Sequence, residues 1–323
     1  MKPLILNGAP LDKPLRARIE EASQCEVLDI SPTDSPDVLT APQRARVVGW
    51  ICTARTPVTA GAIALLPALR VISTRAVGYD NIDVDAAVAR GIVIGYTPGV
   101  LDRAVADLAF AMILCLSRSL IENDRFVRSG AWQQGMAPLS RDLRGKHLGL
   151  LGLGRIGGEL AKLAHGFGLS VSYFQRQRDW AMEEAGVVTY CSRESLFRNA
   201  DFLSVHLPLS ATTLASVGAT EFEWMKPSAW FINTSRGAVV NEVELIDALQ
   251  NRRISGAGLD VMATEPLDPA SPLCHLPNVL LQPHAGSATV ETRAAMMVLA
   301  VDNLLLGLEG KKMLAALEPL KSP

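Results

Sequence analysis

The chain has 323 residues, of which 49% are hydrophobic and 20% charged, and its formal net charge is −2. This length predicts about two domains, and the composition is that of globular proteins. The near-neutral charge excludes a general attraction to nucleic acid or to an anionic membrane surface.

Three further features bear on the compartment. No apolar run reaches the ~20 residues that a membrane span needs, and the apolar run near Met1 is too short for a signal peptide. The five cysteines are scattered and form no C-x-x-C pair, which indicates reduced thiols. We therefore expect a cytoplasmic protein without a metal site.

The first hundred residues predict a small α/β domain. Short buried strands are expected at Leu4–Leu6, Val47–Ile51, Val71–Thr74 and Ile92–Ile94, with helices at 14–23, 59–66 and 84–90. Tyr96-Thr-Pro-Gly99 breaks this pattern, so we expect the chain to leave the domain there. Residues 102–128 then predict one long helix that is apolar enough to be buried, against its own domain or against a second subunit.

A glycine-rich turn follows an apolar strand near residue 147. It reads Gly152-Leu-Gly154-Arg155-Ile156-Gly157 and leads into an amphipathic helix and a second strand, the context of a dinucleotide-binding fingerprint. Gly152 would permit the tight turn, Gly154 the close approach of a pyrophosphate, and Gly157 the packing of helix on strand. The alternative is a plain glycine turn.

The end of the second strand bears on the choice of nucleotide. It continues Gln175-Arg176-Gln177-Arg178, and no carboxylate appears before Asp179 to accept hydrogen bonds from an adenosine ribose. Arginine suits a 2′-phosphate through bidentate, charge-assisted hydrogen bonds. We predict a preference for NADPH, with NADH possible, against the alternative of a solvated basic loop.

The remaining chain alternates strands and helices. Strands are expected at 187–190, 202–205, 229–232, 256–259 and 279–281, and helices at 193–198, 221–225 and 242–251. This order predicts a parallel sheet covered on both faces, with ligands at the carboxyl ends of its strands. A last helix, 288–308, is expected to return to the first domain. The expected domains are therefore 1–100 with 288–323, binding substrate, and 101–287, binding NAD(P).

Three stretches are expected to place catalytic side chains at the carboxyl ends of these strands. Arg236 follows one strand, Glu265 follows the next, and His284 follows the last. An arginine can clamp a carboxylate and polarise the neighbouring carbonyl. A histidine can protonate the carbonyl oxygen as hydride arrives at carbon, and an adjacent carboxylate favours the imidazolium. With a nicotinamide cofactor, these are the requirements of a 2-keto acid reductase.

Several segments together resemble one family, the D-isomer-specific 2-hydroxyacid dehydrogenases, and within it the glyoxylate/hydroxypyruvate reductases. They are Val77–Asn81, Gly95–Pro98, Gly152–Gly157, His206–Leu209, Asn233–Gly237, Gly258–Val261 with Glu265-Pro266, and Pro283–Thr289. The resemblance implies an α/β fold of two domains: a Rossmann-type, doubly wound parallel sheet for the coenzyme and a smaller flavodoxin-like domain for the substrate. It also implies a homodimer formed through the coenzyme domain.

The same resemblance implies roles for individual residues. Arg236 would anchor the substrate, Glu265 would raise the pKa of the acid, and His284 would be that acid. Substrate would also be bound at Val77, Gly78 and Ser287. To the cofactor contacts already expected of Gly152, Gly154, Gly157, Gln175, Arg176 and Arg178, the resemblance adds Arg155, Ile156, Pro208, Thr213, Thr234, Asp260 and Gly286.

Other histidines and arginines leave alternatives. His206 ends a strand and is the rival of His284 as the acid, whereas His147 and His165 are expected to be structural and His275 exposed. Arg55 and Arg75 lie on loops of the first domain, where we favour solvated side chains over recognition of a longer acid.

One departure from the relatives concerns the substrate pocket. Some glyoxylate/hydroxypyruvate reductases have a second tryptophan three residues beyond the one that matches Trp132, and here that position is Gly135. The pocket is therefore expected to be roomier or less apolar.

The predicted function is an NADPH-preferring reductase that converts glyoxylate to glycolate or hydroxypyruvate to D-glycerate. The first alternative is a reductase of a longer 2-keto acid such as 2-ketogluconate. Phosphite and formate dehydrogenases share the fold, but the ordinary loop from Asp260 to Pro266 speaks against them. A non-catalytic scaffold that senses dinucleotides is a further alternative.

Overall fold

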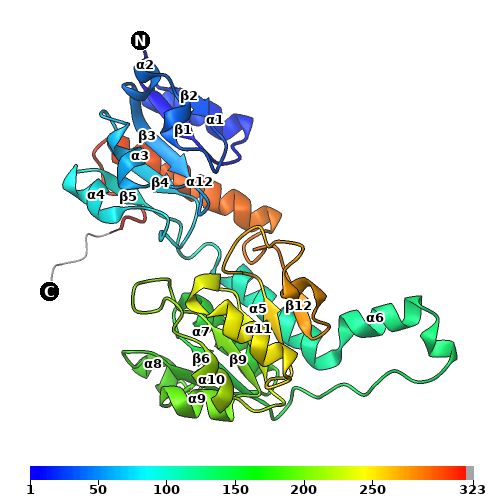
Figure 1. Cartoon of the computed structure of the whole chain (residues 1–323). Helices are drawn as coiled ribbons and strands as arrows, with labels where there is room; N and C mark the ends of the chain where they lie inside the picture. The colour runs from blue at the N-terminus through cyan, green and yellow to red at the C-terminus, as the bar shows by residue number, and fades with distance from the viewer. Residues whose placement is uncertain (318–323) are drawn as a thin grey trace. The chain divides into compact units, whose positions relative to one another are not determined.

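The computed structural model describes residues 1–317, and every strand in that part of the chain belongs to one of two parallel sheets (Figure 1). The sheets belong to two compact units. One is Met1–Leu101 with Thr289–Pro323, described as far as residue 317, and the other is Asp102–Ala288. Both boundaries lie one residue from the expected ones.

The first unit contains a five-stranded sheet of order β2-β1-β3-β4-β5, the flavodoxin-like arrangement. Its strands are β1 (Leu4–Asn7), β2 (Glu26–Asp29), β3 (Val47–Cys52), β4 (Val71–Thr74) and β5 (Val93–Gly95). Its helices are α1 (Lys13–Ser23), the short α2 (Ala41–Arg44), α3 (Ala60–Ala64), α4 (Val84–Ala89) and α12 (Val290–Leu308), with a 3₁₀ turn, η1, at Pro36–Val38.

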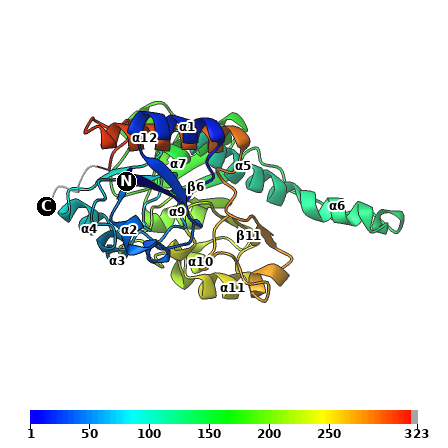
Figure 2. The same cartoon turned by 90° about the horizontal axis from the view of Figure 1, so that it is seen from above.

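Alternation along the strands divides the core of this unit into two layers. Ile5 and Val71 pack with the apolar face of α12, whereas Leu6 and Ile72 pack with α3 and α4 on the other face. Figure 2 shows α1 and α12 side by side, and these two helices contact each other. The last helix therefore completes the first sheet, as the sequence predicts.

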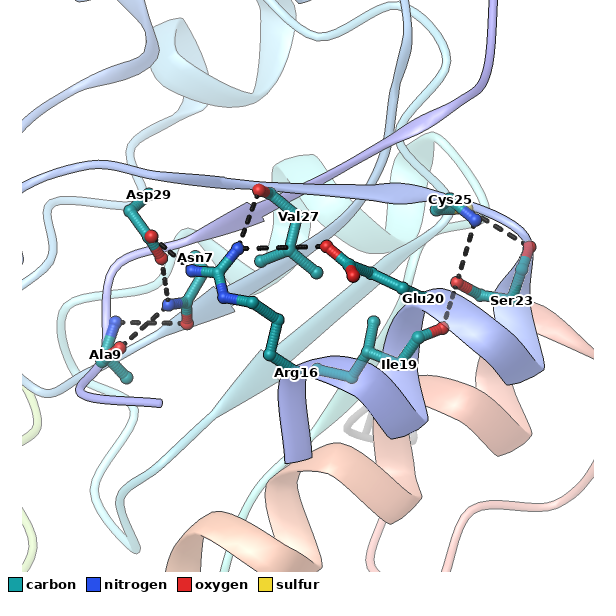
Figure 3. A network of polar contacts seen from close by, with 9 residues as sticks. All are labelled: Asn7, Ala9, Arg16, Ile19, Glu20, Ser23, Cys25, Val27 and Asp29. Atoms are coloured by element: carbon teal, nitrogen blue, oxygen red, sulfur yellow. Dashed lines mark hydrogen bonds and ion pairs between the residues drawn. The ribbon is translucent and has the colours of Figure 1, made fainter. Parts of the chain in front are cut away.

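Polar contacts fix α1 to the edge of this sheet (Figure 3). Arg16 donates to the backbone oxygen of Val27 at 2.9 Å and pairs with Asp29 on the edge strand. Asn7 Nδ2 in turn donates to Asp29 Oδ1 at 2.7 Å. The polar edge strand β2, which hydrophobic periodicity does not reveal, is thus held by side chains of β1 and α1.

The second unit contains a seven-stranded sheet of order β12-β11-β10-β9-β6-β7-β8, which is the doubly wound Rossmann order. Its strands are β6 (His147–Leu151), β7 (Ser170–Phe174), β8 (Thr189–Tyr190), β9 (Phe202–Val205), β10 (Trp230–Asn233), β11 (Gly256–Leu259) and β12 (Val279–Leu281). Its helices are α5 (Asp102–Arg118), α6 (Leu120–Arg128), α7 (Arg155–Gly166), α8 (Trp180–Glu184), α9 (Arg193–Asn199), α10 (Ala219–Trp224) and α11 (Glu242–Gln250), with 3₁₀ turns η2 (Ala131–Gln133), η3 (Gly237–Val239) and η4 (Pro272–His275).

Helices cover both faces of this sheet. Leu148 and Leu150 of β6 join the core formed with α5 and α7, whereas Leu151 and Leu203 join the core formed with α9, α10 and α11. The predicted fold class, an α/β protein with two parallel sheets, is therefore confirmed.

The long helix expected over residues 102–128 is instead two helices. Ser119 has a left-handed backbone, with φ of +49°, and α5 and α6 meet at a bend of 55°. α5 is largely buried, whereas α6 contributes no buried residue and projects from its unit in Figures 1 and 2. Within residues 1–317, no single helix is long and apolar enough to cross a membrane, although this bent pair passes by length and composition.

Two smaller expectations also differ. The strand expected over residues 187–190 is reduced to the two residues of β8, and α8 precedes it without a sequence prediction. Hydrophobic periodicity does not reveal the short helix α8, because five of the seven residues from Arg176 to Met182 are exposed.

Candidate active site

Three loops that follow β10, β11 and β12 are joined by backbone hydrogen bonds. Asp260 N donates to Asn233 O at 2.9 Å, and Gln282 N donates to Leu259 O at 2.8 Å. The three strands are parallel neighbours, so their carboxyl ends lie at one edge of the sheet. This edge carries Arg236, Glu265 and His284.

His284 and Glu265 form a hydrogen-bonded pair. The Nδ1 of His284 lies 2.7 Å from Glu265 Oε2, and Glu265 Oε1 accepts from the backbone N–H of Met262 at 3.3 Å. With Glu265 as a carboxylate, Nδ1 carries the hydrogen of this bond and Nε2 is the nitrogen left for another partner. His284 also has φ of +56°, a conformation that a residue other than glycine adopts only when its surroundings enforce it.

Asp260 enforces that conformation. Its carboxylate accepts from Ala285 N at 2.6 Å through Oδ1 and from Gly286 N at 2.9 Å through Oδ2, and its backbone oxygen accepts from His284 N at 2.8 Å. The side chain is 1% exposed, and burial raises its pKa, opposed by these hydrogen bonds. The resemblance implies that Asp260 contacts the cofactor, and its two carboxylate oxygens also hold the loop of His284.

Arg236 extends from the loop after β10. Asn233 shapes this loop, because its Oδ1 accepts from Ser235 N at 3.0 Å and its Nδ2 donates to Arg236 O at 3.0 Å. A Cβ on Gly237 would lie 2.0 Å from the backbone of Met262. Glycine at 237 therefore lets the arginine loop pack directly against the loop that leads to Glu265.

His206, the rival acid, lies beside the glycine turn. Its Nε2 is 2.9 Å from Ser204 Oγ, and although part of the residue is exposed, burial of the ring lowers the pKa of His206 to about 4. A neutral imidazole at physiological pH is a poor proton donor, which favours His284.

The other histidines are accounted for by their surroundings. His147 is held by Ser170 and Ser172, each 2.7 Å from a ring nitrogen, and burial lowers its pKa. His275 is exposed as expected. His165 is exposed on α7 instead of structural, because it falls on the polar face of that helix.

The glycine turn has the geometry that a pyrophosphate requires. Gly152 has φ of +99°, and a Cβ there would meet His206 O at 2.9 Å, while a Cβ on Gly157 would meet Gly152 O at 2.8 Å. Gly154 is exposed, has no atom within 4 Å of a Cβ position, and begins α7 without a side-chain cap. The first N–H groups of this helix therefore face open space, as an anion site needs.

The predicted nucleotide-binding residues on the loop after β7 differ in the contacts that their side chains make. Gln175 Oε1 accepts from Leu153 N at 2.9 Å and so ties this loop to the glycine turn. Arg178 turns away: its Nε donates to Glu183 at 3.1 Å and its guanidinium lies 4.0 Å over the ring of Trp180. Arg176 is exposed and makes no ion pair within residues 1–317. Of the two arginines predicted to bind the nucleotide, Arg178 is held by another side chain and Arg176 makes no ion pair within residues 1–317.

The remaining predicted cofactor residues lie on neighbouring loops of the same unit. Thr213 Oγ1 donates to Pro208 O at 2.6 Å and so shapes the loop after β9. The hydroxyl of Thr234 is buried without a hydrogen-bond partner within residues 1–317. Arg155 is exposed and Ile156 partly exposed at the start of α7, and Gly286 is buried against Asp260. An orphaned hydroxyl and an open helix terminus fit a dinucleotide.

Val77 and Gly78 lie in the other unit, on the loop after β4. Neither backbone N–H donates a hydrogen bond within the described residues, and both residues are partly exposed. Asn81 holds this loop by donating from Nδ2 to Thr56 O at 2.7 Å and to Thr53 O at 3.0 Å. Ser287 is partly exposed in the second unit. Two N–H donors side by side can bind a carboxylate.

Arg55 and Arg75, both expected to be solvated, differ. Arg55 is exposed, whereas Arg75 is partly buried and its Nε is inaccessible to solvent. The expectation is therefore wrong for Arg75. Alternation gives no signal for it, because all four residues of β4 are buried and Arg75 lies in the bend that follows the strand.

The chain belongs to the D-isomer specific 2-hydroxyacid dehydrogenase family, whose NAD binding domain matches residues 110–286. It is therefore an NAD(P)-dependent oxidoreductase of that family.

Named relatives agree with this assignment. The chain is 48% identical over 249 residues to glyoxylate/hydroxypyruvate reductase B of Salmonella newport (strain SL254), covering 76% of this chain and 77% of that protein. The structure resembles the NADPH-dependent glyoxylate/hydroxypyruvate reductase of Sinorhizobium meliloti in complex with NADP and malonate, with a TM-score of 0.89, 36% identity, and coverage of 98% and 97% of the two chains. It also resembles a glyoxylate reductase from Paecilomyes thermophila, with a TM-score of 0.88, 30% identity, and 98% coverage of each chain.

Proposed function

We propose that this protein is a 2-keto acid reductase that converts glyoxylate to glycolate and hydroxypyruvate to D-glycerate. The observation that carries the proposal is the 2.7 Å contact of His284 Nδ1 with Glu265 Oε2, at the sheet edge that also bears Arg236. The names of the relatives support the choice of these two substrates.

In this proposal His284 is the general acid. Glu265 accepts the Nδ1 hydrogen, which orients the ring and stabilises the imidazolium. Nε2 then gives its proton to the carbonyl oxygen of the substrate, which becomes the hydroxyl of the product. The hydrogen bonds from Asp260 to the loop of His284 keep the ring in place.

The substrate carboxylate is held by Arg236 and by backbone donors. The planar guanidinium can form two parallel hydrogen bonds with one carboxylate, which fixes the direction of the adjacent carbonyl. The N–H groups of Val77 and Gly78, without partners within the described residues, are further donors, and Ser287 completes the proposed contacts. Such clamping orients the carbonyl for reaction.

The cofactor proposed here is NADP. Gly152, Gly154 and the first turn of α7 would hold the pyrophosphate, and Arg176 would bind the 2′-phosphate. Thr234 and Thr213 would be further contacts of the cofactor. When bound, the nicotinamide supplies the hydride that adds to the carbonyl carbon. The absence of a carboxylate from residues 175–178 supports NADPH over NADH, as does the NADPH dependence of the Sinorhizobium meliloti relative.

A homodimer is also part of the proposal. Residues 120–139, which we call the arm, comprise α6, η2 and the segment that follows. The arm exposes large apolar side chains: Trp132 is 67% exposed and Leu139 is 94% exposed. An exposed apolar surface of this kind is typical of a protein–protein interface. A second copy of the chain is the proposed partner. The five free cysteines support a reducing, cytoplasmic location.

Steady-state reduction of three acids with each cofactor tests this function. Glyoxylate and hydroxypyruvate should be reduced, with a higher kcat/KM for NADPH than for NADH. A clear preference for 2-ketogluconate would favour the alternative of a longer substrate. If none of the three acids oxidised either cofactor although both bound, the reductase would be ruled out in favour of a dinucleotide-sensing scaffold.

A further inference from the structure

The loop that follows β11 leads to Glu265 with little support from its own backbone. Residues 261–264 take part in no backbone–backbone hydrogen bond within residues 1–317, and Ala263 and Thr264 are exposed. Glu265 nevertheless holds one carboxylate oxygen 2.7 Å from His284 Nδ1. The position of this loop therefore depends on contacts with side chains.

Glu242, the first residue of α11, supplies such a contact from outside the loop. Its Oε2 accepts from the backbone N–H of Ala263 at 2.8 Å. The N–H of the preceding residue, Met262, donates to Glu265 Oε1 at 3.3 Å. Two consecutive N–H groups of the loop are thus divided between two carboxylates, one that pairs with His284 and one that belongs to α11.

Helix α11 is a firm support for this contact. Its apolar face is part of the core through Leu245, Ala248 and Leu249. A negative charge in the first turn interacts favourably with the helix dipole, and a charged acceptor makes a stronger hydrogen bond than a neutral one. On the other side, the backbone of Met262 packs directly on Gly237. The loop is therefore held between α11 and the loop of Arg236.

We propose that Glu242 is a positioning residue for the reaction. Through Ala263 it fixes the loop of Glu265, and through Glu265 it fixes the ring of His284. The hydrogen bond that one imidazole nitrogen makes decides which nitrogen carries the hydrogen in the neutral ring. A well-placed Glu265 keeps that hydrogen on Nδ1, which is the form that remains after Nε2 has given its proton to the substrate. This inference rests on the proposed function, in which His284 is the acid.

Kinetics of Glu242→Ala and Glu244→Ala test the proposal. Both glutamates lie in the first turn of α11, and both accept a backbone N–H, that of Ala263 for Glu242 and that of Ala219, at 2.6 Å, for Glu244. Both changes weaken the start of the helix, but only the first releases the loop of Glu265. In Glu242→Ala, kcat for glyoxylate should fall about 3- to 30-fold while KM for NADPH stays within about twofold. Glu244→Ala is the matched control and should keep the wild-type kcat.

Two further variants at the same position separate the hydrogen bond from the charge. Glu242→Gln retains an amide oxygen that can accept from Ala263 N, so it should recover most of the kcat that the alanine variant loses. Glu242→Asp keeps the charge but withdraws the carboxylate by one methylene group. It should lower kcat, and it serves if the alanine variant does not fold.

The tautomer of His284 is a second readout, which a general loss of stability would not change. ¹⁵N NMR at alkaline pH, where imidazole side chains are neutral, distinguishes a hydrogen on Nδ1 from one on Nε2. The signal of His284 is assigned by its absence from His284→Gln. The wild type should carry the hydrogen on Nδ1, Glu242→Ala should show a larger share of the Nε2 form, and Glu244→Ala should match the wild type.

The proposal is overturned if Glu242→Ala keeps the wild-type kcat, if it keeps the wild-type tautomer, or if Glu244→Ala loses as much kcat. Failure of the proposed function gives a different result. If the wild type reduces neither glyoxylate nor hydroxypyruvate, the NMR measurement decides the present inference alone. A tautomer shift in Glu242→Ala but not in Glu244→Ala then supports it, and an unchanged tautomer contradicts it.

Discussion

Arg176 and Arg178 are two residues apart, yet only one has a side chain that is not already engaged. Glu183 holds Arg178 in an ion pair, with Trp180 and Tyr190 beneath the guanidinium. Arg176 is exposed. Cofactor choice at this site should therefore depend on a single arginine.

Arg176→Ala should lower the NADPH-to-NADH ratio of kcat/KM about 10- to 100-fold, because a charged contact with the 2′-phosphate is lost. Arg178→Ala is the matched control and should change the ratio much less. Steady-state kinetics with both cofactors measures this. An unchanged ratio in Arg176→Ala, or equal losses in both variants, would show that the assignment is wrong.

His206 predicts a pH dependence of stability. Its pKa is lowered from 6.5 to about 4 in the folded protein, so between these values the unfolded chain binds a proton that the folded protein does not. The free energy of unfolding should therefore fall as the pH falls through this window, by about 3 kcal/mol in total.

Urea unfolding of wild type and His206→Gln between pH 7 and pH 4 measures this contribution. The variant should show a pH dependence that is weaker by about that amount, whereas His275→Gln, which alters an exposed histidine, should follow the wild type. Parallel curves for wild type and His206→Gln would contradict the burial of the ring.

At the scale of elements, much of the architecture follows from the sequence. The period of the apolar residues and the glycine turn predict the parallel sheets, the nucleotide turn and the return of α12 to the first unit. The chain could not reveal the edge strand β2, because its pattern Glu-Val-Leu-Asp is polar at both ends. Nor could it reveal the break at Ser119, where the apolar pattern continues and only the backbone changes.

The candidate site divides in the same way. The side-chain types of Arg236, Glu265 and His284 predict the chemistry of the site. The parallel strands that precede them predict that all three lie at one edge of the sheet. The ion pair of Arg178 with Glu183 and the burial of Arg75 depend on contacts that only the folded chain creates. The role of Asp260 could not be predicted from the sequence either, because it depends on hydrogen bonds from two backbone N–H groups in the loop that follows the next strand.

The loop between β12 and α12 should depend on Asp260. In Asp260→Asn one acceptor oxygen is replaced by an amide that opposes the N–H of Ala285 or Gly286, so one buried donor loses its partner. We expect a loss of about 1–3 kcal/mol in the free energy of unfolding and a lower kcat, because the loop of His284 is less firmly held.

Urea unfolding and glyoxylate kinetics check this, with Asp247→Asn as the control because Asp247 is exposed on α11. If Asp260→Asn were as stable and as active as the wild type, the carboxylate would not be what holds the histidine loop.

At the scale of the whole molecule, the arm is the feature that a single copy does not explain. Val127 is 52% exposed and Trp132 67% exposed on a segment that projects from its unit (Figure 1). The double variant Val127→Glu, Trp132→Glu should be monomeric by size-exclusion chromatography with light scattering, whereas the wild type should be a dimer. Charges placed in an apolar interface are costly to bury.

Val243→Glu is the matched control, since Val243 is 77% exposed on α11, and it should remain dimeric. A wild type that is monomeric at micromolar concentration, or a double variant that stays dimeric, would contradict the proposed interface.

The central claim is that His284, oriented by Glu265, delivers the proton in the reduction of a 2-keto acid. It is tested most directly by kcat for glyoxylate with NADPH at neutral pH in wild type and His284→Gln, with the Kd for NADPH as a check on the fold. We predict a fall in kcat of about 10²- to 10⁴-fold with little change in Kd. A His284→Gln variant that kept near-full kcat would contradict the account.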